Sequence, residues 1–306
     1  MKKKIGLALG SGGARGLCEI GVLLWLKEHD IRISCIAGTS MGALIGAAAA
    51  AGYSPEHMKE IALKLNWKDF LKYMRLSFSG KSIFEWDKIE SNLREDFGTK
   101  RIEELPIPFA CTAADIDSGL GFVFRDGDLV DAISASACIP GVFPPVHVMG
   151  RNLVDGELVD PVPLDLAAEL GAQRIIGVDA CRSVFSERTS HESRHFPVVE
   201  RLDEWFRDNM KKAPIISSLA GFKKIAGEDK KERRRRNLID LFTDSLAIVT
   251  SRLLSFERLN AGPHFMIRPQ VGGFQDFDFD RADEIIEIGY KEIDSVGDEL
   301  LDFIES

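Results

Sequence analysis

A serine with glycines close on both sides is the clearest sign of chemistry in this sequence. Residues 38–42 read Gly-Thr-Ser-Met-Gly, a Gly-x-Ser-x-Gly pattern centred on Ser40. In this pattern the serine can stand on a sharp turn between a strand and a helix, where its hydroxyl acts as a nucleophile. Gly38 and Gly42 permit such a turn, because larger side chains would clash across it. The pattern also occurs by chance, so its weight depends on the elements around it.

A second glycine-rich stretch, residues 9–16 with the sequence LGSGGARG, follows an apolar run and opens a helical pattern. Backbone N–H groups at such a place favour a negative charge. A dinucleotide site would need glycine where Arg15 stands and an acid after the second strand, and a nucleotide phosphate loop would need Gly-Lys-Ser/Thr. The sequence has neither the dinucleotide pattern nor the phosphate loop, which argues against a nucleotide-dependent oxidoreductase. An oxyanion hole made by the N–H groups of Gly12 and Gly13, or a purely structural tight turn, remains.

A nucleophilic serine usually depends on a histidine base. The chain contains six histidines: His29, His57, His147, His191, His195 and His264. On sheets of this kind the chain order is serine, acid, histidine, so the base should stand in a late loop after a strand. The serious candidate is His147, which would lie opposite Asp155 if its hairpin had a three-residue turn. The other five are interpreted as ordinary surface residues.

A carboxylate is the alternative base. Asp155 lies at the end of an apolar run, in the sequence LVDG, and is followed by Gly156 at a predicted turn. With a reference pKa of about 3.9, an aspartate is ionised at neutral pH and is only a weak base. Placement beside the hydroxyl, in a site that excludes water, can compensate for that weakness. A simple turn residue is the competing interpretation.

The spacing of apolar residues predicts elements that bring these groups together. Buried strands are expected at 4–9 and 33–38, each followed by a helix, and this order is typical of a parallel sheet with helices on both faces. Both glycine-rich loops would then lie at the carboxyl ends of adjacent strands, where sites form. Residues 55–104 are expected to be mainly helical. Further predictions are helices at 14–30, 40–52, 129–140, 164–172 and 280–305, strands at 109–116, 119–127, 174–180 and 264–269, and a hairpin at 146–156 turning near Gly150–Asn152.

Composition limits the function classes. The chain has 306 residues and a net charge of −9, so nucleic acid is not expected as a main partner. Its five cysteines are scattered, odd in number and without a Cys-x-x-Cys pair, as in a reduced cytoplasmic protein. The apolar start is too short for a signal peptide, and no window reaches the roughly 20 apolar residues of a membrane span. A cytoplasmic location is expected, with peripheral membrane contact as an additional expectation.

Residues 183–240 interrupt the alternating pattern. They combine an aromatic-rich stretch, which includes Trp205, Phe206 and Phe222, with the basic cluster KKERRRR at 230–236. A charged run of this kind is most simply a solvated surface insertion. A second interpretation is a lid or interfacial helix that contacts anionic lipid. We therefore expect one domain over 1–306 that carries an insertion at about 183–240.

Taken together, the motifs resemble those of the patatin-like phospholipases. The resemblance rests on GSGGARG at 10–16, GTSMG at 38–42, the Asp155-Gly156 pair, and ASACIPGVFPP at 135–145. The later stretch IRPQVGGFQDFDFDRADEIIEIGY, residues 267–290, is similar to the bacterial branch related to neuropathy target esterase. Each motif alone is common, but the set in this order is specific.

The resemblance implies a three-layer α/β/α fold with a mostly parallel central sheet, and hydrolysis of fatty-acyl esters by a Ser–Asp dyad without metal or cofactor. It makes Ser40 the nucleophile and Asp155 the base, with Gly12 and Gly13 forming the oxyanion hole and Arg15 stabilising that loop. Phospholipid, lysophospholipid or a related ester is the implied substrate. A non-catalytic lipid-binding or membrane-docking module of the same fold remains the alternative.

One departure from the family pattern concerns the residue after the Asp-Gly pair. The family usually has glycine or alanine there, whereas this chain has Glu157. A second carboxylate near Asp155 would raise its pKa if it faced the site, and would have no such effect if it pointed to solvent.

Overall fold

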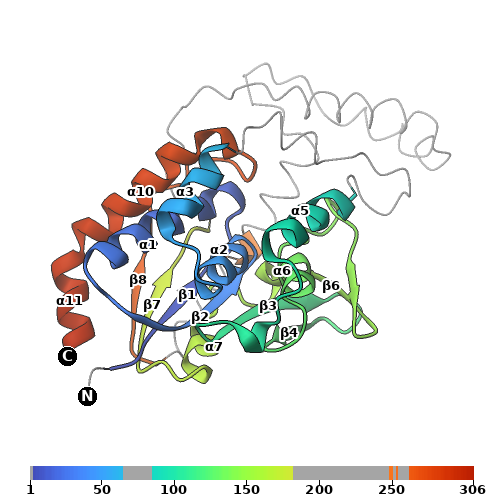
Figure 1. Cartoon of the computed structure of the whole chain (residues 1–306), viewed down its shortest axis with the longest axis horizontal. Coiled ribbons are helices and arrows are strands. Elements are labelled where there is room, and N and C mark those ends of the chain that lie inside the picture. The colour runs from blue at the N-terminus through green and yellow to red at the C-terminus, as the bar shows by residue number, and fades with distance from the viewer. Residues whose placement is uncertain (1–2, 65–84, 182–247, 251–252, 254–261) are drawn as a thin grey trace, which may run out of the picture. The chain divides into compact units, whose positions relative to one another are not determined.

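The computed structural model describes residues 3–64, 85–181, 248–250, 253 and 262–306, which fall in one compact unit (Figure 1). The charged segment 183–240, with the lid or interfacial role considered for it, lies outside the described residues. Within those ranges, no helix has both the length and the apolar character needed to cross a bilayer.

The described chain forms an eight-stranded mixed sheet in the order β5-β6-β3-β2-β1-β7-β8, with β4 also paired to β3 (Figure 1). Strands β3, β2, β1, β7 and β8 are parallel, while β4 and β6 are antiparallel to β3, and β5 is antiparallel to β6. The predicted mostly parallel sheet is therefore confirmed. The strands are β1 (Ile5–Leu9), β2 (Ile33–Thr39), β3 (Phe109–Asp115), β4 (Leu120–Phe124), β5 (Val146–Val148), β6 (Arg151–Asp155), β7 (Arg174–Val178) and β8 (His264–Ile267).

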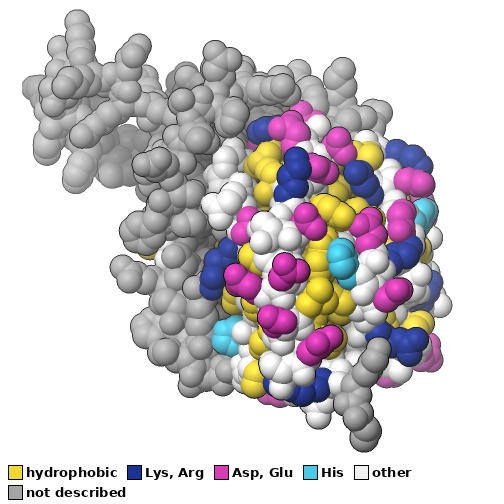
Figure 2. Space-filling model, turned by 90° about the vertical axis from the view of Figure 1, so that its left-hand side faces the viewer, with side chains coloured by type: hydrophobic (Ala, Val, Ile, Leu, Met, Phe, Trp, Pro, Cys, Tyr) yellow, Lys and Arg dark blue, Asp and Glu magenta, His cyan; other side chains and the backbone are white. Residues whose placement is uncertain are grey.

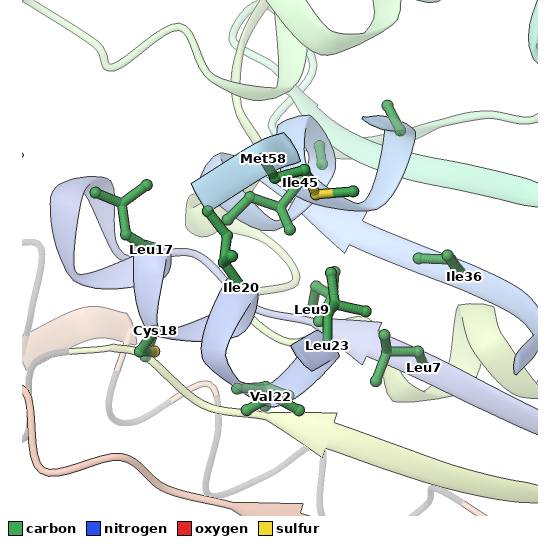
Figure 3. Close-up of a cluster of buried hydrophobic side chains, with 14 of the residues drawn as sticks. Leu7, Leu9, Leu17, Cys18, Ile20, Val22, Leu23, Ile36, Ile45 and Met58 are labelled. Carbon is green, nitrogen blue, oxygen red and sulfur yellow. The ribbon is translucent and has the colours of Figure 1, made fainter. Parts of the chain in front are cut away.

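Helices cover both faces of this sheet. Because side chains alternate along a strand, Leu7 and Leu9 of β1 pack into a large core on one face, and Ala8 packs into a smaller core on the other. Helix α7 contributes to the smaller core, and the other described helices contribute to the larger one, part of which Figure 3 shows. The helices are α1 (Cys18–Glu28), α2 (Met41–Ala50), α3 (Pro55–Lys64), α5 (Asp87–Phe97), α6 (Leu129–Ser136), α7 (Leu164–Glu169), α10 (Ala282–Ser295) and α11 (Gly297–Glu305).

The C-terminal helices pack against α1, although the two regions are far apart in the sequence. A Cβ atom on Gly21 would lie 2.0 Å from Ile286 O, and one on Gly289 would lie 1.9 Å from Cys18 O, so glycines permit this close approach. Trp25 Nε1 also donates to Asp294 Oδ1 at 2.9 Å. On the side of the molecule where α10 and α11 lie, acidic and basic side chains are interspersed (Figure 2).

Three predicted helices differ from those observed. The helix at 14–30 begins with a 3-10 segment, Gly13–Leu17, before α1. The terminal helix at 280–305 is divided into α10 and α11, and Gly297 at the break packs against the Trp25 ring, where a Cβ atom would lie 2.7 Å from Cζ2. The helix at 129–140 ends at Ser136, four residues before the proline that was expected to stop it.

The predicted hairpin is present, but its turn lies earlier than expected. Met149 and Gly150 form a two-residue turn with φ angles of 52° and 72°, which suits the twist of the flanking strands. This register pairs His147 with Asn152. The expectation that His147 could lie opposite Asp155 was therefore wrong, because it required a three-residue turn.

Candidate active site

Strand β3 brings the ends of two other strands together. Thr39, the last residue of β2, pairs with Thr112, and Asp155, the last residue of β6, pairs with the adjacent Ala113. Strand β4 pairs with both of these β3 residues, so β2 and β6 must share the opposite edge of β3. The two strands approach each other end to end along that edge. Ser40, directly after Thr39, is thereby placed beside Asp155.

The turn from β2 into α2 holds Ser40 in a conformation that side chains rarely adopt. Its φ and ψ are 57° and −120°, as expected for a sharp turn under strain. A Cβ atom on Gly38 would lie 2.4 Å from Gly42 O, and one on Gly42 would lie 2.3 Å from Leu9 O. Gly42 N also donates to Gly10 O at 3.1 Å. Both glycines are thus required sterically, and Gly42 links the serine turn to the other glycine-rich loop.

Ser40 and Asp155 are in direct contact. Ser40 Oγ donates to Asp155 Oδ2 at 2.6 Å, and both residues are buried. The other carboxylate oxygen, Oδ1, accepts the Glu157 N–H at 2.9 Å, and Asp155 N donates to Cys138 O at 2.9 Å. The carboxylate is therefore fixed in orientation and aimed at the hydroxyl.

The surroundings of Asp155 make it a stronger base than an exposed aspartate. Burial raises its pKa, and the charge of Glu157 raises it further, while the hydrogen bond from Ser40 opposes both. The net effect is a pKa of about 8. A base with a pKa near the working pH accepts a proton more readily than one near 4, which removes the main objection to a carboxylate in this role.

The loop after β1 lies beside this turn. A Cβ atom on Gly16 would be 2.6 Å from Met41 Cγ, directly after the serine. Gly10 N donates to Val178 O and Ser11 N to Pro161 O, which fix the start of the loop. Considering only the residues that the structure describes, the N–H groups of Gly12 and Gly13 have no acceptor. Free N–H groups of this kind suit a developing negative charge, so their proposed role as an oxyanion hole stays a prediction that the geometry permits.

The side chain of Arg15 is almost fully buried. Its Nη2 donates to Asp276 Oδ1 at 2.6 Å, and its Nη1 donates to Phe274 O at 3.2 Å. Burial alone would lower the pKa of Arg15, but the charges of Asp276 and Glu157 raise it above its usual value, so the side chain stays charged. The guanidinium ties the glycine-rich loop to a segment about 260 residues away.

Glu157 is half-buried, and its charge acts on Asp155. Its Oε1 accepts from Thr250 Oγ1 at 2.9 Å, and Thr250 is itself buried. Burial and the charge of Asp276 raise the pKa of Glu157, and the charge of Arg15 lowers it. Glu157, the residue that departs from the family pattern, is therefore a second acid beside Asp155. Its charge raises the pKa of Asp155.

None of the described histidines touches Ser40. His147 is exposed, and its Nδ1 lies 3.2 Å from Asn152 Oδ1. His29 stacks on Trp25, and His264 Nδ1 lies 2.8 Å from Gly262 O. Of the remaining three, His57 is exposed on α3, and the other two, His191 and His195, lie outside the described residues.

Two residues that contact the candidate site were not predicted from the sequence. Ser136, buried at the end of α6, accepts the Ser40 N–H at its Oγ at 2.9 Å. A signal for it existed, because Ser136 belongs to the ASACIPGVFPP motif. Asp276 had no such signal, since its partner Arg15 lies at the other end of the chain.

Comparison with known proteins adds independent information. A family model described as "Patatin-like phospholipase" matches residues 7–168, more than half of the chain. An uncharacterized NTE family protein of Mycobacterium tuberculosis is 41% identical over 175 residues, which cover 57% of this chain and 48% of that protein. Human patatin-like phospholipase domain-containing protein 6 is 27% identical, with 94% of this chain and 20% of that protein covered. This chain thus spans half or less of the length of these relatives.

Among solved structures, the crystal structure of VipD from Legionella pneumophila aligns with a TM-score of 0.44 at 13% identity, covering 97% of this chain and 67% of that one.

Proposed function

This chain belongs to the patatin-like phospholipase family, and from that premise we propose that it is a serine acyl hydrolase that cleaves fatty-acyl esters of lipids through a Ser40–Asp155 dyad. The observation that carries the proposal is the 2.6 Å hydrogen bond from Ser40 Oγ to Asp155 Oδ2. A hydroxyl bonded to a buried, oriented carboxylate is the arrangement that activates a serine when no histidine is near.

The proposed reaction has two halves. Ser40 Oγ attacks the ester carbonyl carbon while Asp155 takes the hydroxyl proton, and the carbonyl oxygen becomes an alkoxide next to the N–H groups of Gly12 and Gly13. The alkoxide collapses, the leaving alcohol receives the proton from Asp155, and an acyl-serine remains. Water then attacks the acyl group with Asp155 as base. The fatty acid departs, and Ser40 recovers its proton.

The fixed environment of Asp155 supports its role in both halves. Its carboxylate keeps one oxygen on the Glu157 N–H and offers the other to Ser40. The raised pKa lets it accept and return a proton near neutral pH. The substrate class that we propose is phospholipid, lysophospholipid or a related fatty-acyl ester, since relatives of this chain carry the phospholipase name.

Covalent labelling tests the proposal directly. A fluorophosphonate probe should label the wild-type protein on Ser40 and should not label Ser40→Ala. A panel of phospholipids, lysophospholipids and nitrophenyl esters should then give fatty-acid release that depends on Ser40. Well-folded protein that neither labels nor hydrolyses any of these would instead favour the non-catalytic lipid-binding module.

A further inference from the structure

The segment Phe274–Asp276 contacts the glycine-rich loop at several points. Asp276 O accepts the Ala14 N–H at 2.8 Å, and Asp276 Oδ1 accepts from Arg15 Nη2 at 2.6 Å. Gly13, with a φ of 55°, lies so close that a Cβ atom there would be 2.7 Å from Asp276 O. One residue therefore holds the main chain of Ala14 and the side chain of Arg15, which directly follow Gly12 and Gly13.

The contact with Arg15 is an ion pair in which the cation is buried and the carboxylate is half-buried. The Arg15 side chain is 6% exposed and that of Asp276 is 25% exposed. A buried cation whose partner is removed is strongly destabilised, so it seeks another anion or moves toward water. Glu157 is the next acid whose charge acts on Arg15. We therefore expect loss of the Asp276 carboxylate to shift Arg15, and the loop that carries it, toward Glu157.

We propose that Asp276 is a positioning residue for the oxyanion loop: through Arg15 and Ala14 it holds the N–H groups of Gly12 and Gly13 where the substrate's alkoxide forms. The inference rests on the proposed function, because it assigns a role in that reaction. Asp276 does not touch Ser40 or Asp155 in the described contacts. Its charge also raises the pKa of Asp155, so its effect through the loop is measured at a pH above that pKa, where Asp155 is ionised in every variant.

The test compares Asp276→Asn with a matched variant, Asp278→Asn. Asp278 lies two residues after Asp276 and is buried, and its Oδ2 accepts the Gln275 N–H at 2.9 Å. Its replacement loosens the segment but leaves the partner of Arg15 in place. For a nitrophenyl ester, kcat of Asp276→Asn should fall by about 10- to 100-fold, below the 10²- to 10³-fold loss of a whole oxyanion donor, with KM nearly unchanged. Asp278→Asn should keep kcat within about two-fold of wild type.

Two measurements separate positioning from general loosening. The inhibition constant of a long-chain trifluoromethyl ketone, whose adduct with Ser40 carries an oxyanion, should rise by the same factor as kcat falls. In a cycle with Arg15→Met, the double variant should lose no more than Arg15→Met alone, because Asp276 acts through Arg15. Additive losses, or equal losses in Asp278→Asn, would overturn the inference.

A readout independent of activity completes the test. Amide hydrogen exchange at Gly12, Gly13 and Ala14 should become faster in Asp276→Asn and stay unchanged in Asp278→Asn. If the wild type is active and Asp276→Asn has the same kcat and the same amide exchange rates, this inference is wrong and the proposed function is unaffected. If the wild type neither reacts with the fluorophosphonate probe nor hydrolyses any ester, the proposed function itself is wrong. If Asp276→Asn does not fold, Asp276→Glu replaces it, since it keeps the charge but displaces the carboxylate from Arg15; a smaller fall in kcat and faster exchange at Gly12 and Gly13 are expected, and wild-type values of both would overturn the inference.

Discussion

Ser40 Oγ and Asp155 Oδ2 lie 2.6 Å apart although 115 residues separate them in the chain. Their contact is set by β3, whose successive residues Thr112 and Ala113 pair with the ends of β2 and β6. Because main-chain pairing fixes the backbone of both partners, the proposed nucleophile and base should lose little conformational freedom when a substrate binds.

Removal of His147 tests whether the base is a carboxylate. Because His147 is exposed and pairs with Asn152 in β5–β6, His147→Ala should keep ester hydrolysis within about two-fold of wild type. Ser40→Ala and Asp155→Ala should each lower kcat/KM on the order of 10⁴-fold, as loss of a nucleophile or its base does. Steady-state kinetics on a nitrophenyl ester measure all three. Near-complete loss of ester hydrolysis in His147→Ala would contradict the Ser40–Asp155 dyad.

The pH profile should follow the ionisation of Asp155. The base must be ionised to accept the Ser40 proton, so kcat/KM should rise with pH and level off above about 8, the pKa of this carboxyl. Below that value the rate should fall roughly ten-fold per pH unit.

Glu157 should affect the pH at which this profile inflects. Its negative charge raises the pKa of Asp155, so Glu157→Gln should move the inflection to lower pH. The exposed His147 serves as a control, since His147→Ala should leave the inflection in place. An unchanged profile in Glu157→Gln would contradict electrostatic coupling between the two acids.

The hydrogen bond under the serine turn can be tested with two serines of α6. Ser136→Ala removes the acceptor of the buried Ser40 N–H, so the free energy of unfolding should fall by about 1–3 kcal/mol, with a loss in kcat. Ser134 is equally buried and has no partner among the described residues, so Ser134→Ala should be neutral or stabilising. Urea unfolding and ester kinetics measure both. Equal behaviour of the two variants would remove any special role for Ser136.

The sequence was sufficient for the parts of the site that depend on local structure. The turn at Ser40 needs glycines at fixed offsets, and the strand before it is a short apolar run, so spacing alone predicted the β2–turn–α2 unit. The parallel sheet followed from strands that alternate with helices. Only the family resemblance made Asp155 more than a turn residue, because no local pattern shows that β6 ends against β2.

The parts that the sequence could not predict are set by pairing between distant segments. The register of His147 depended on a single turn residue, since Met149 adopts a positive φ that glycine or asparagine usually supplies. The orientation of Glu157 depended on Thr250, and the pairing of Arg15 depended on how α10 packs on α1. Such contacts leave no periodicity in a single sequence.

Gly42 should tolerate no side chain. In Gly42→Ala the new Cβ would lie 2.3 Å from Leu9 O and 2.6 Å from Gly10 O, and these backbone atoms belong to β1 and its loop. We expect a loss of about 3 kcal/mol in the free energy of unfolding, together with loss of hydrolysis. Gly121→Ala in β4 is the control, because its Cβ would meet Val159 at an ordinary 3.6 Å. Urea unfolding compares the two, and similar stability would argue against the steric requirement.

The strain at Ser40 should be measurable as stability. Ser40→Ala and Ser40→Gly both remove the hydroxyl, but only alanine keeps a Cβ atom at a φ of 57°. Because such a backbone conformation costs on the order of 1–3 kcal/mol for a residue with a side chain, Ser40→Gly should have the higher free energy of unfolding, by about 1 kcal/mol. Ala48→Gly, in the regular helix α2, should change stability by a similar amount in the opposite sense. Urea unfolding gives all of these values, and a glycine variant at position 40 less stable than the alanine variant would show that the turn stores no strain.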